Sequence, residues 1–320
     1  MKRLKRYLLT AITIAVVIMG IRFTQELEDW SKLLTYEPPP EVARLATATT
    51  MTDSARRLFY LNQPTIEATR SFLNLCKGSE HTIVLGCYVV SKGIFLQEIT
   101  DARLQGVMEV TAAHELLHAV YQRMSLFDQT QINQQLQAVL SNLQNPRILK
   151  LVTTYGSQDP RSVASELHSI FGTELRSLSP ELETHYRRYF TDRASIVALS
   201  EQYEGVFTTL KGKAKILSEQ LNTQNLALEQ LVEQVKQESK MVEVDRSNLQ
   251  TAIVANPQDD YTSRVSAFND RVQNYNQLVI QLKAQTASYN QLVTARNSIS
   301  QEEKSLFESL ENKSTQQVAK

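Results

Sequence analysis

The sequence predicts an α+β fold: a small mixed domain followed by a long helical hairpin. Two runs rich in apolar and β-branched residues, 82–90 and 93–99, are separated by two polar residues and predict a β-hairpin. Amphipathic helical patterns follow in the middle of the chain, and heptad patterns fill its last third. All five histidines and both cysteines lie between residues 76 and 185. The side chains suited to chemistry are therefore expected in the middle domain.

Composition and charge narrow the class of protein. The 320 residues suffice for about two domains, and a hydrophobic content of 42% with 9 Gly and 8 Pro argues against extensive disorder. The 34 basic residues are balanced by 34 acidic residues. Because no overall positive field would attract a phosphate backbone, we expect no nucleic-acid partner.

The N-terminus has the pattern of a membrane anchor. Four lysines and arginines among the first six residues precede an apolar run over 7–21. The basic flank is expected to stay in the cytoplasm, which makes 1–23 a single-pass transmembrane helix of the cell membrane with the main domain extracytoplasmic. A cleaved signal peptide has similar parts, but no small-residue cleavage site follows the run. Residues 24–49, with the stiff YEPPP stretch at 36–40, are expected to form a linker.

The two cysteines suit an exported domain. Cys76 and Cys87 bracket a polar stretch with a turn signal at 77–79. In an oxidising compartment a disulfide would close this loop and add about 2–3 kcal/mol of stability. Two reduced, buried thiols are the alternative.

Three helices are predicted after the β-hairpin. The first covers 107–124, and the second begins near Asp128 as N-cap and is broken at Asn145-Pro146. The third opens at Asp159-Pro160, with proline in its first position, and runs through about Ile170.

The first of these helices carries the motif HELLH. Histidines four positions apart project from one helix face, so His114 and His118 can bind the same ion. Zinc accepts neutral imidazoles, and a catalytic zinc site has three protein ligands and a water. Glu115 would lie beside the ion, where it can take a proton from that water as the general base. The motif therefore indicates Zn²⁺ as cofactor, and the alternative is a helix with two surface histidines.

At these residues the chain resembles the zincin metallopeptidases, over roughly 82–190. The run GVMEVTAAHELLHAVY at 106–121 is also similar to that of uncharacterised bacterial membrane-anchored proteins with an HExxH helix. The resemblance implies a zinc-dependent hydrolase that cleaves a peptide or protein substrate, with its metallopeptidase domain over 50–194. In zincins a strand just before the active-site helix commonly pairs with the substrate backbone, and 93–99 has that position here.

The third zinc ligand distinguishes the subclasses of zincin. The metzincin extension would need glycine and histidine at the positions of Tyr121 and Met124. The chain therefore resembles the gluzincins instead, which take a glutamate from a later helix. The segment SVASELHSIFGTE at 162–174 offers three candidates, which are Glu166, His168 and Glu174.

Helical geometry separates the three candidates. Glu166 shares a face with Val163, Leu167 and Ile170, and a charged group on this inward face needs a partner such as zinc. His168 lies about 200° from Glu166 around the helix and is expected to point away. Glu174 follows Gly172, which is expected to end the helix. Glu166 is the favoured ligand, a structural salt bridge being its alternative role.

The segment THYRRYFTDR at 184–193 contains candidate hydrogen-bond donors to the oxyanion of the reaction. Zincins often use a tyrosine or a histidine for this purpose. His185 and Tyr189 are four positions apart and could face the cleft together, as could Tyr186 from a neighbouring direction. Ordinary helix packing with a basic surface patch is the alternative interpretation.

The last third, 195–320, predicts an antiparallel coiled-coil hairpin. Apolar residues follow heptad spacing on both sides of a break at Asn256-Pro257, and each arm would be about 75 Å long. Polar Gln224, Glu238 and Asp245 interrupt the seam of the first arm. We expect the hairpin to serve as a spacer or to bind a protein partner.

Two functions are compatible with these patterns. The first is a membrane-anchored zinc metallopeptidase. The second is a non-catalytic scaffold of the cell envelope, in which the coiled coil binds partners and the HELLH region is structural. A closed structural site needs a fourth protein ligand, and a scaffold has no need of Glu115, so the motif favours the first function.

Overall fold

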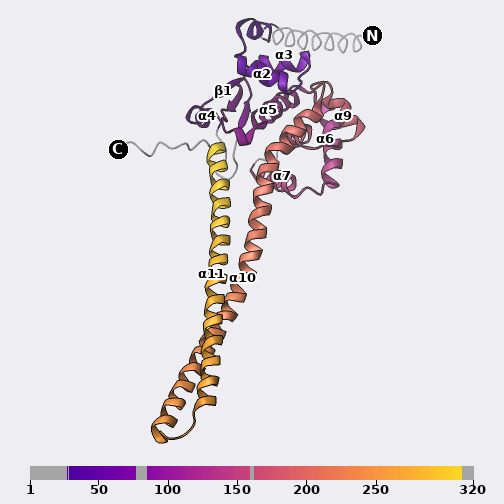
Figure 1. Ribbon diagram of the computed structural model, residues 1–320. Coiled ribbons are helices and arrows are strands. Elements are labelled where there is room, and N and C mark those ends of the chain that lie inside the picture. The colour runs from indigo at the N-terminus through magenta and orange to yellow at the C-terminus, as the bar shows by residue number, and fades with distance from the viewer. Residues whose placement is uncertain (1–26, 28, 77–84, 159–161, 312–320) are drawn as a thin grey trace, which may run out of the picture. The chain divides into compact units, whose positions relative to one another are not determined.

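The computed structural model describes residues 27, 29–76, 85–158 and 162–311 (Figure 1). These residues form mainly α-helices, with one three-stranded sheet. The expected anchor at 1–23 lies outside the described residues. Within the described part, none of the helices has the length and apolar character needed to cross a membrane.

The chain divides into two compact units. The first contains residues 1–206 and 306–320, and the second contains 207–305. The division therefore differs from the expected boundaries of 50–194 and 195–320, because it falls inside the long helix α10, Arg193–Ala255. It also returns the end of α11, Thr262–Glu311, to the first unit.

The end of α11 belongs to the first unit because it is packed and hydrogen-bonded there. Leu306 and Leu310 are buried. The side-chain amide of Gln97 donates to the carbonyl of Leu310 at 2.5 Å, and the Ser309 hydroxyl donates to Asp101 at 2.7 Å. The last turn of α11 is therefore part of the first unit's core.

The sheet contains the predicted β-hairpin and a third strand. Strands β2, Gly86–Val89, and β3, Gly93–Gln97, pair antiparallel, which confirms the hairpin. Strand β1, Thr65–Glu67, pairs parallel with the other side of β3. The order β1-β3-β2 makes β3 the central strand. Our expectation that 93–99 lies at the cleft edge is therefore wrong, and β2 is the edge strand next to the motif helix.

Eight α-helices of the first unit precede α10 among the described elements. They are α2, Pro40–Ala48; α3, Asp53–Leu61; α4, Thr69–Leu75; α5, Val107–Arg123; α6, Leu126–Ser141; α7, Pro146–Gln158; α8, Val163–Glu174; and α9, Pro180–Tyr186. Helix α2 lies within 24–49, where a linker was expected. Its Val42, Leu45 and Ala46 are fully buried, because their helical spacing forms one apolar stripe that joins the core.

Two helix starts differ from the sequence prediction. Helix α6 begins after Ser125 rather than Asp128, because the Ser125 hydroxyl accepts the backbone N–H of Asp128 at 3.1 Å as an N-cap. Asn145-Pro146 opens α7 as well as ending α6, since the Asn145 side chain accepts the backbone N–H of Arg147. Asp159-Pro160 lies outside the described residues, and α8 begins at Val163.

Helices α5 and α8 pack closely in the centre of the first unit. Their facing residues Leu117, Leu167 and Phe171 are fully buried. Gly172 does not end α8, which continues to Glu174. A Cβ atom at Gly172 would lie 2.4 Å from Leu117 Cδ1 and 2.7 Å from Tyr186 Cε1. The glycine is therefore needed for close packing inside the helix rather than for helix termination.

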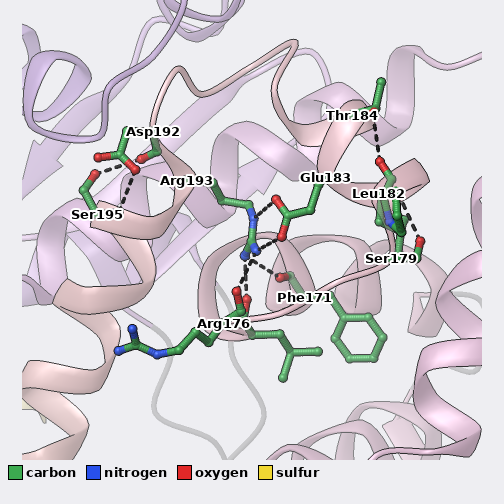
Figure 2. Close-up of polar contacts among 11 residues, drawn as sticks. Phe171, Arg176, Ser179, Leu182, Glu183, Thr184, Asp192, Arg193 and Ser195 are labelled. Carbon is green, nitrogen blue, oxygen red and sulfur yellow. Dashed lines mark hydrogen bonds and ion pairs between the residues drawn. The ribbon is translucent and has the colours of Figure 1, made fainter.

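A buried arginine holds the far end of α8 in place. Figure 2 shows the Arg193 guanidinium between Glu183 of α9 and the end of α8. It donates to the carbonyls of Leu175 at 2.6 Å and Arg176 at 3.2 Å. A cation there is favourable because the last carbonyls of a helix have no partners within it. The first residue of α10 thereby fixes the end of α8.

The second unit is the predicted antiparallel hairpin. Polar pairs cross from one arm to the other, and as the residue number rises along α10 that of its partner falls along α11. The pairs are Gln224 with Ser288, Glu238 with Asn274, and Asp245 with Arg271. The three polar residues that interrupt the heptad seam therefore bind the opposite arm.

Candidate metal centre

Helices α5 and α8 bring together three side chains that could hold a metal ion. The Nε2 atoms of His114 and His118 are 3.1 Å apart, and each is 3.6 Å from a carboxylate oxygen of Glu166. All three ligand atoms lie within 4.8 Å of one another. Donors bound to one zinc ion at tetrahedral angles are about 3.3–3.6 Å apart. The spacing of this group fits a single ion.

Two further observations fit a bound cation. The Nδ1 atom of His118 is 2.8 Å from the Ser165 hydroxyl, a contact that orients the ring so that Nε2 faces the group. The Oε2 atom of Glu166 is buried and has no hydrogen-bond partner. A buried carboxylate oxygen without a donor is costly, and a cation between the imidazoles and this oxygen would satisfy it. The donor set of two imidazoles and one carboxylate suits zinc.

Without an ion the three groups perturb one another. Burial opposes protonation of His114, yet the nearby carboxylates of Glu166 and Glu115 raise its pKa to about 9. Burial lowers the pKa of His118 to about 4. The imidazoles hold the pKa of Glu166 below its usual range despite burial of the carboxylate. The site thus favours a positive charge next to the Glu166 carboxylate. A zinc ion would place a larger positive charge there than one protonated imidazole.

Glu115 lies beside the group and against the edge strand. Its side chain is 5% exposed, and burial raises its pKa to about 7. The backbone N–H of Tyr88 in β2 donates to it. A Cβ atom at Gly86 would lie 2.9 Å from Glu115 Cγ and 2.5 Å from Thr111 Cγ2. Glycine at this position therefore allows β2 to approach α5 and orient the carboxylate.

A cavity of about 960 Å³ is lined by His114, His118 and Glu166, called the metal group from here on. Edge strand β2 lines one part of it through Gly86, Cys87 and Tyr88, and α5 and α8 line the rest. Tyr203 of α10, within the first unit, also lines the cavity, and burial raises the pKa of its phenol. The cavity therefore joins the edge strand β2 to Glu115 and to the metal group.

The other two candidate ligands pair with other side chains, although Glu174 also lines the cavity. Glu174 is the last residue of α8 and pairs with Arg147, which also lies 3.3 Å from Glu204. His168 lies off the metal group, as predicted, but it is fully buried on another face of α8. Its Nε2 atom is 2.8 Å from Nε2 of His185. Neither belongs to the group of three.

The structure does not bring the expected oxyanion donors to the metal group. His185 and Tyr189 line a separate cavity of about 630 Å³. The Tyr186 hydroxyl donates to the backbone carbonyl of His168 at 2.8 Å. His185 and Tyr186 pack α9 against His168 of α8, and Tyr189 contacts the His185 ring, which agrees with helix packing as the alternative considered for them.

Sequence reasoning missed several residues around the metal group. Ser165 could have been found, because it directly precedes Glu166 and hydroxyl groups often orient metal-bound histidines. Tyr203 carries no local signal, since it lies beyond the expected domain boundary in a long helical pattern. Tyr88 was assigned to a strand but not to the cleft, because the sheet order is not visible in the sequence.

Comparisons with protein families, curated proteins and solved structures found no match for this chain. The resemblance to zincins therefore stays an expectation from the motif. The function is inferred below from the arrangement of His114, His118, Glu166 and Glu115.

Proposed function

We propose that this chain is a membrane-anchored, zinc-dependent metallopeptidase with its main domain outside the cytoplasm. The observation that carries the proposal is the meeting of Glu166, from α8, with the two histidines of the HELLH helix. The buried Oε2 atom of Glu166 adds to it, because it has no hydrogen-bond partner and lies 3.6 Å from Nε2 of His114, which leaves room for an ion. Glu115 lies beside these ligands as the motif requires.

Each residue has a distinct role in the proposed reaction. His114, His118 and Glu166 would hold the zinc ion, which when bound would lower the pKa of a water and polarise the scissile carbonyl. Glu115 takes the proton from the attacking water and passes it to the leaving amine. Its raised pKa suits a base and acid that works near neutral pH.

The substrate would be bound as an extended peptide next to β2. Edge strands offer backbone groups to a peptide, and β2 lines the cavity at the level of Glu115. We assign the oxyanion donor to Tyr203 instead of His185 and Tyr189. Its phenol lines this cavity and is protonated at neutral pH, so it can donate a hydrogen bond there.

A closed structural zinc site is less well supported. Among the described residues the group contains three ligands, and it lies in a cavity large enough for a peptide segment. Three protein ligands with an open position are typical of catalytic zinc. A scaffold would also give no reason for a buried Glu115 beside the ligands.

The decisive experiment combines metal analysis with peptide cleavage by the full-length chain in detergent. We expect about one zinc ion per chain, lost in His114→Ala. Glu115→Gln should retain zinc and lose cleavage of an unfolded protein substrate. If wild-type protein purified without chelators is metal-free and cannot be loaded, the proposal is wrong. Equal activity of Glu115→Gln and wild type would refute the role of the base.

The topology is tested separately. A reporter fused after Lys320 should be active only in the exported compartment, because the basic N-terminal flank is expected to stay inside. Activity of the reporter in the cytoplasm would refute the proposed location. That result would not contradict the zinc chemistry, since none of the proposed metal ligands lies near the anchor in sequence.

A further inference from the structure

Exposed apolar side chains gather where the described chain begins. Residues 29–35 are helical, and Leu27, Trp30 and Leu34 are spaced along one helix face. They are 50%, 59% and 65% exposed. Large apolar side chains that are this exposed in a row indicate a surface that meets something apolar.

A second segment adds two apolar side chains beside this helix. Leu126 and Phe127, at the start of α6, are 83% and 69% exposed. They follow Arg123, whose guanidinium donates to both carboxylate oxygens of Asp29 at 2.8 and 2.9 Å. Because Leu126 is three residues from Arg123, its Cα lies within about 11 Å of that of Arg123. The ion pair therefore holds the two segments next to each other.

Cations surround the same ion pair. Lys32, Arg57 and Arg123 all lower the pKa of Asp29, so their charges lie close to its carboxylate. A cavity of about 640 Å³ next to them is lined by Leu27, Trp30, Leu58, Arg57 and Arg123. Apolar side chains combined with lysine and arginine match the interface of a bilayer, where acyl chains lie below phosphate headgroups.

The sequence before Leu27 indicates that a membrane covers this surface. The apolar run at 7–21 ends six residues before Leu27, so an extended chain could separate them by at most about 20 Å. If 7–21 lies in a membrane, Leu27 and Trp30 must lie close to that membrane. Tryptophan is also the side chain most enriched at the membrane–water interface.

We propose that the first unit rests on the lipid bilayer through a docking surface formed by Leu27, Trp30, Leu34, Leu126 and Phe127. Lys32 and Arg57 would bind anionic headgroups beside these side chains, while Arg123 stays paired with Asp29. This inference depends on the membrane anchor of the proposed function, but not on its zinc chemistry. It implies that the catalytic unit has a fixed contact with the membrane rather than swinging on a flexible tether.

The test uses full-length protein in vesicles of phosphatidylcholine and phosphatidylglycerol, with and without bromine on the acyl chains. Trp30 is the chain's single tryptophan, so its fluorescence reports one position. The variant Trp30→Phe/Phe127→Trp moves the reporter to α6. The control Trp30→Phe/Leu73→Trp places it on α4, where Leu73 is 59% exposed but outside the docking surface.

We expect brominated lipids to quench the reporters at positions 30 and 127 and to leave the reporter at 73 unchanged. Quenching at 30 alone would overturn the proposal, because only the helix next to the anchor would then touch lipid. Absence of quenching at both positions in protein that floats with the vesicles would also overturn it, and would favour a protein partner on this surface. Protein that fails to float with the vesicles would refute the anchor and this contact together.

Discussion

Gly172→Ala tests whether the metal group depends on the close packing of α5 and α8. The added Cβ atom would lie 2.4 Å from Leu117 Cδ1 and 2.7 Å from Tyr186 Cε1. Contacts below 3.0 Å require something to move, and both neighbours are fully buried. We therefore expect α8 to shift away from α5, which carries His114 and His118.

The magnitude follows from two opposing terms. Extra methyl groups forced into a packed core cost about 1–3 kcal/mol. The change from glycine to alanine inside a helix would by itself stabilise by about 1 kcal/mol. Since contacts at these distances put the packing cost at the upper end, we expect a net loss of about 1–2 kcal/mol. Glu166 lies nearly two turns before Gly172 on α8, so a shift of the helix also widens the 3.6 Å spacing to both histidines.

The assay is chemical denaturation of the metal-free protein together with a zinc competition titration. Gly205→Ala and Gly212→Ala in α10 are matched controls, because a Cβ atom there would meet nothing within 4 Å. Both should be neutral or stabilising and keep wild-type zinc affinity. In a double-mutant cycle, Leu117→Ala should relieve part of the cost of Gly172→Ala. Unchanged stability and zinc affinity in Gly172→Ala would refute the packing argument.

Three further predictions concern the first unit. His185 is buried against His168, Tyr186 and Tyr189, and burial, with Arg188 nearby and opposed by Asp128, lowers its pKa to about 4. Its folded-state pKa is below the unfolded value of about 6.5, so stability is complete above pH 6.5 and falls by up to about 3 kcal/mol towards pH 4. His185→Gln should remove its share of this fall, to which His118 and His168 also contribute because burial lowers their pKa values as well, and an unaltered curve would contradict the burial argument. Arg193→Met should cost about 3–5 kcal/mol in denaturation, because it leaves Glu183 and the end of α8 without their partner. Arg176→Met, which removes a solvent-exposed pair with Glu201, is its control, and equal effects of the two changes would count against the role of Arg193. Cys76 and Cys87 are bridged, as the sequence predicted, and close a loop with a separation of 11 residues. Reduction, or the double change to serine, should lower the free energy of unfolding by about 2–3 kcal/mol, and no difference between reduced and oxidised protein would refute this.

Features with a strong local pattern could be predicted from the sequence. The motif helix, the β-hairpin and the coiled-coil arms all have clear periodicity, and helix-face geometry was enough to choose Glu166 over His168. The structure places Glu166, and not Glu174, with the two histidines, but the reason given against Glu174 was wrong. Glu174 is inside α8, and its pairing with Arg147 is what occupies it.

Features that depend on distant packing could not be predicted. The prolines at 38–40 suggested a linker, whereas the third of them opens α2, whose apolar stripe is short but fully buried. The edge position of β2 depends on β1 pairing with the far side of β3, which three residues of sequence do not reveal. Tyr203 lines the cavity only because the first residue of α10, Arg193, binds the C-terminal end of α8.

The first turns of α10 are part of the first unit rather than the start of a separable arm. Arg193 holds the end of α8, and Ile196 and Val197 are buried in the first unit. Tyr203 lines the cavity, and Glu204 shares Arg147 with Glu174 at the last residue of α8. A cut after residue 194 would keep Arg193 but remove the contacts of Ile196, Val197, Tyr203 and Glu204, and also the last turn of α11 that packs beside Gln97. Any excision of the hairpin must therefore keep residues up to 206 and from 306 onward, because the helix that carries Glu166 is supported by the same helix that begins the hairpin.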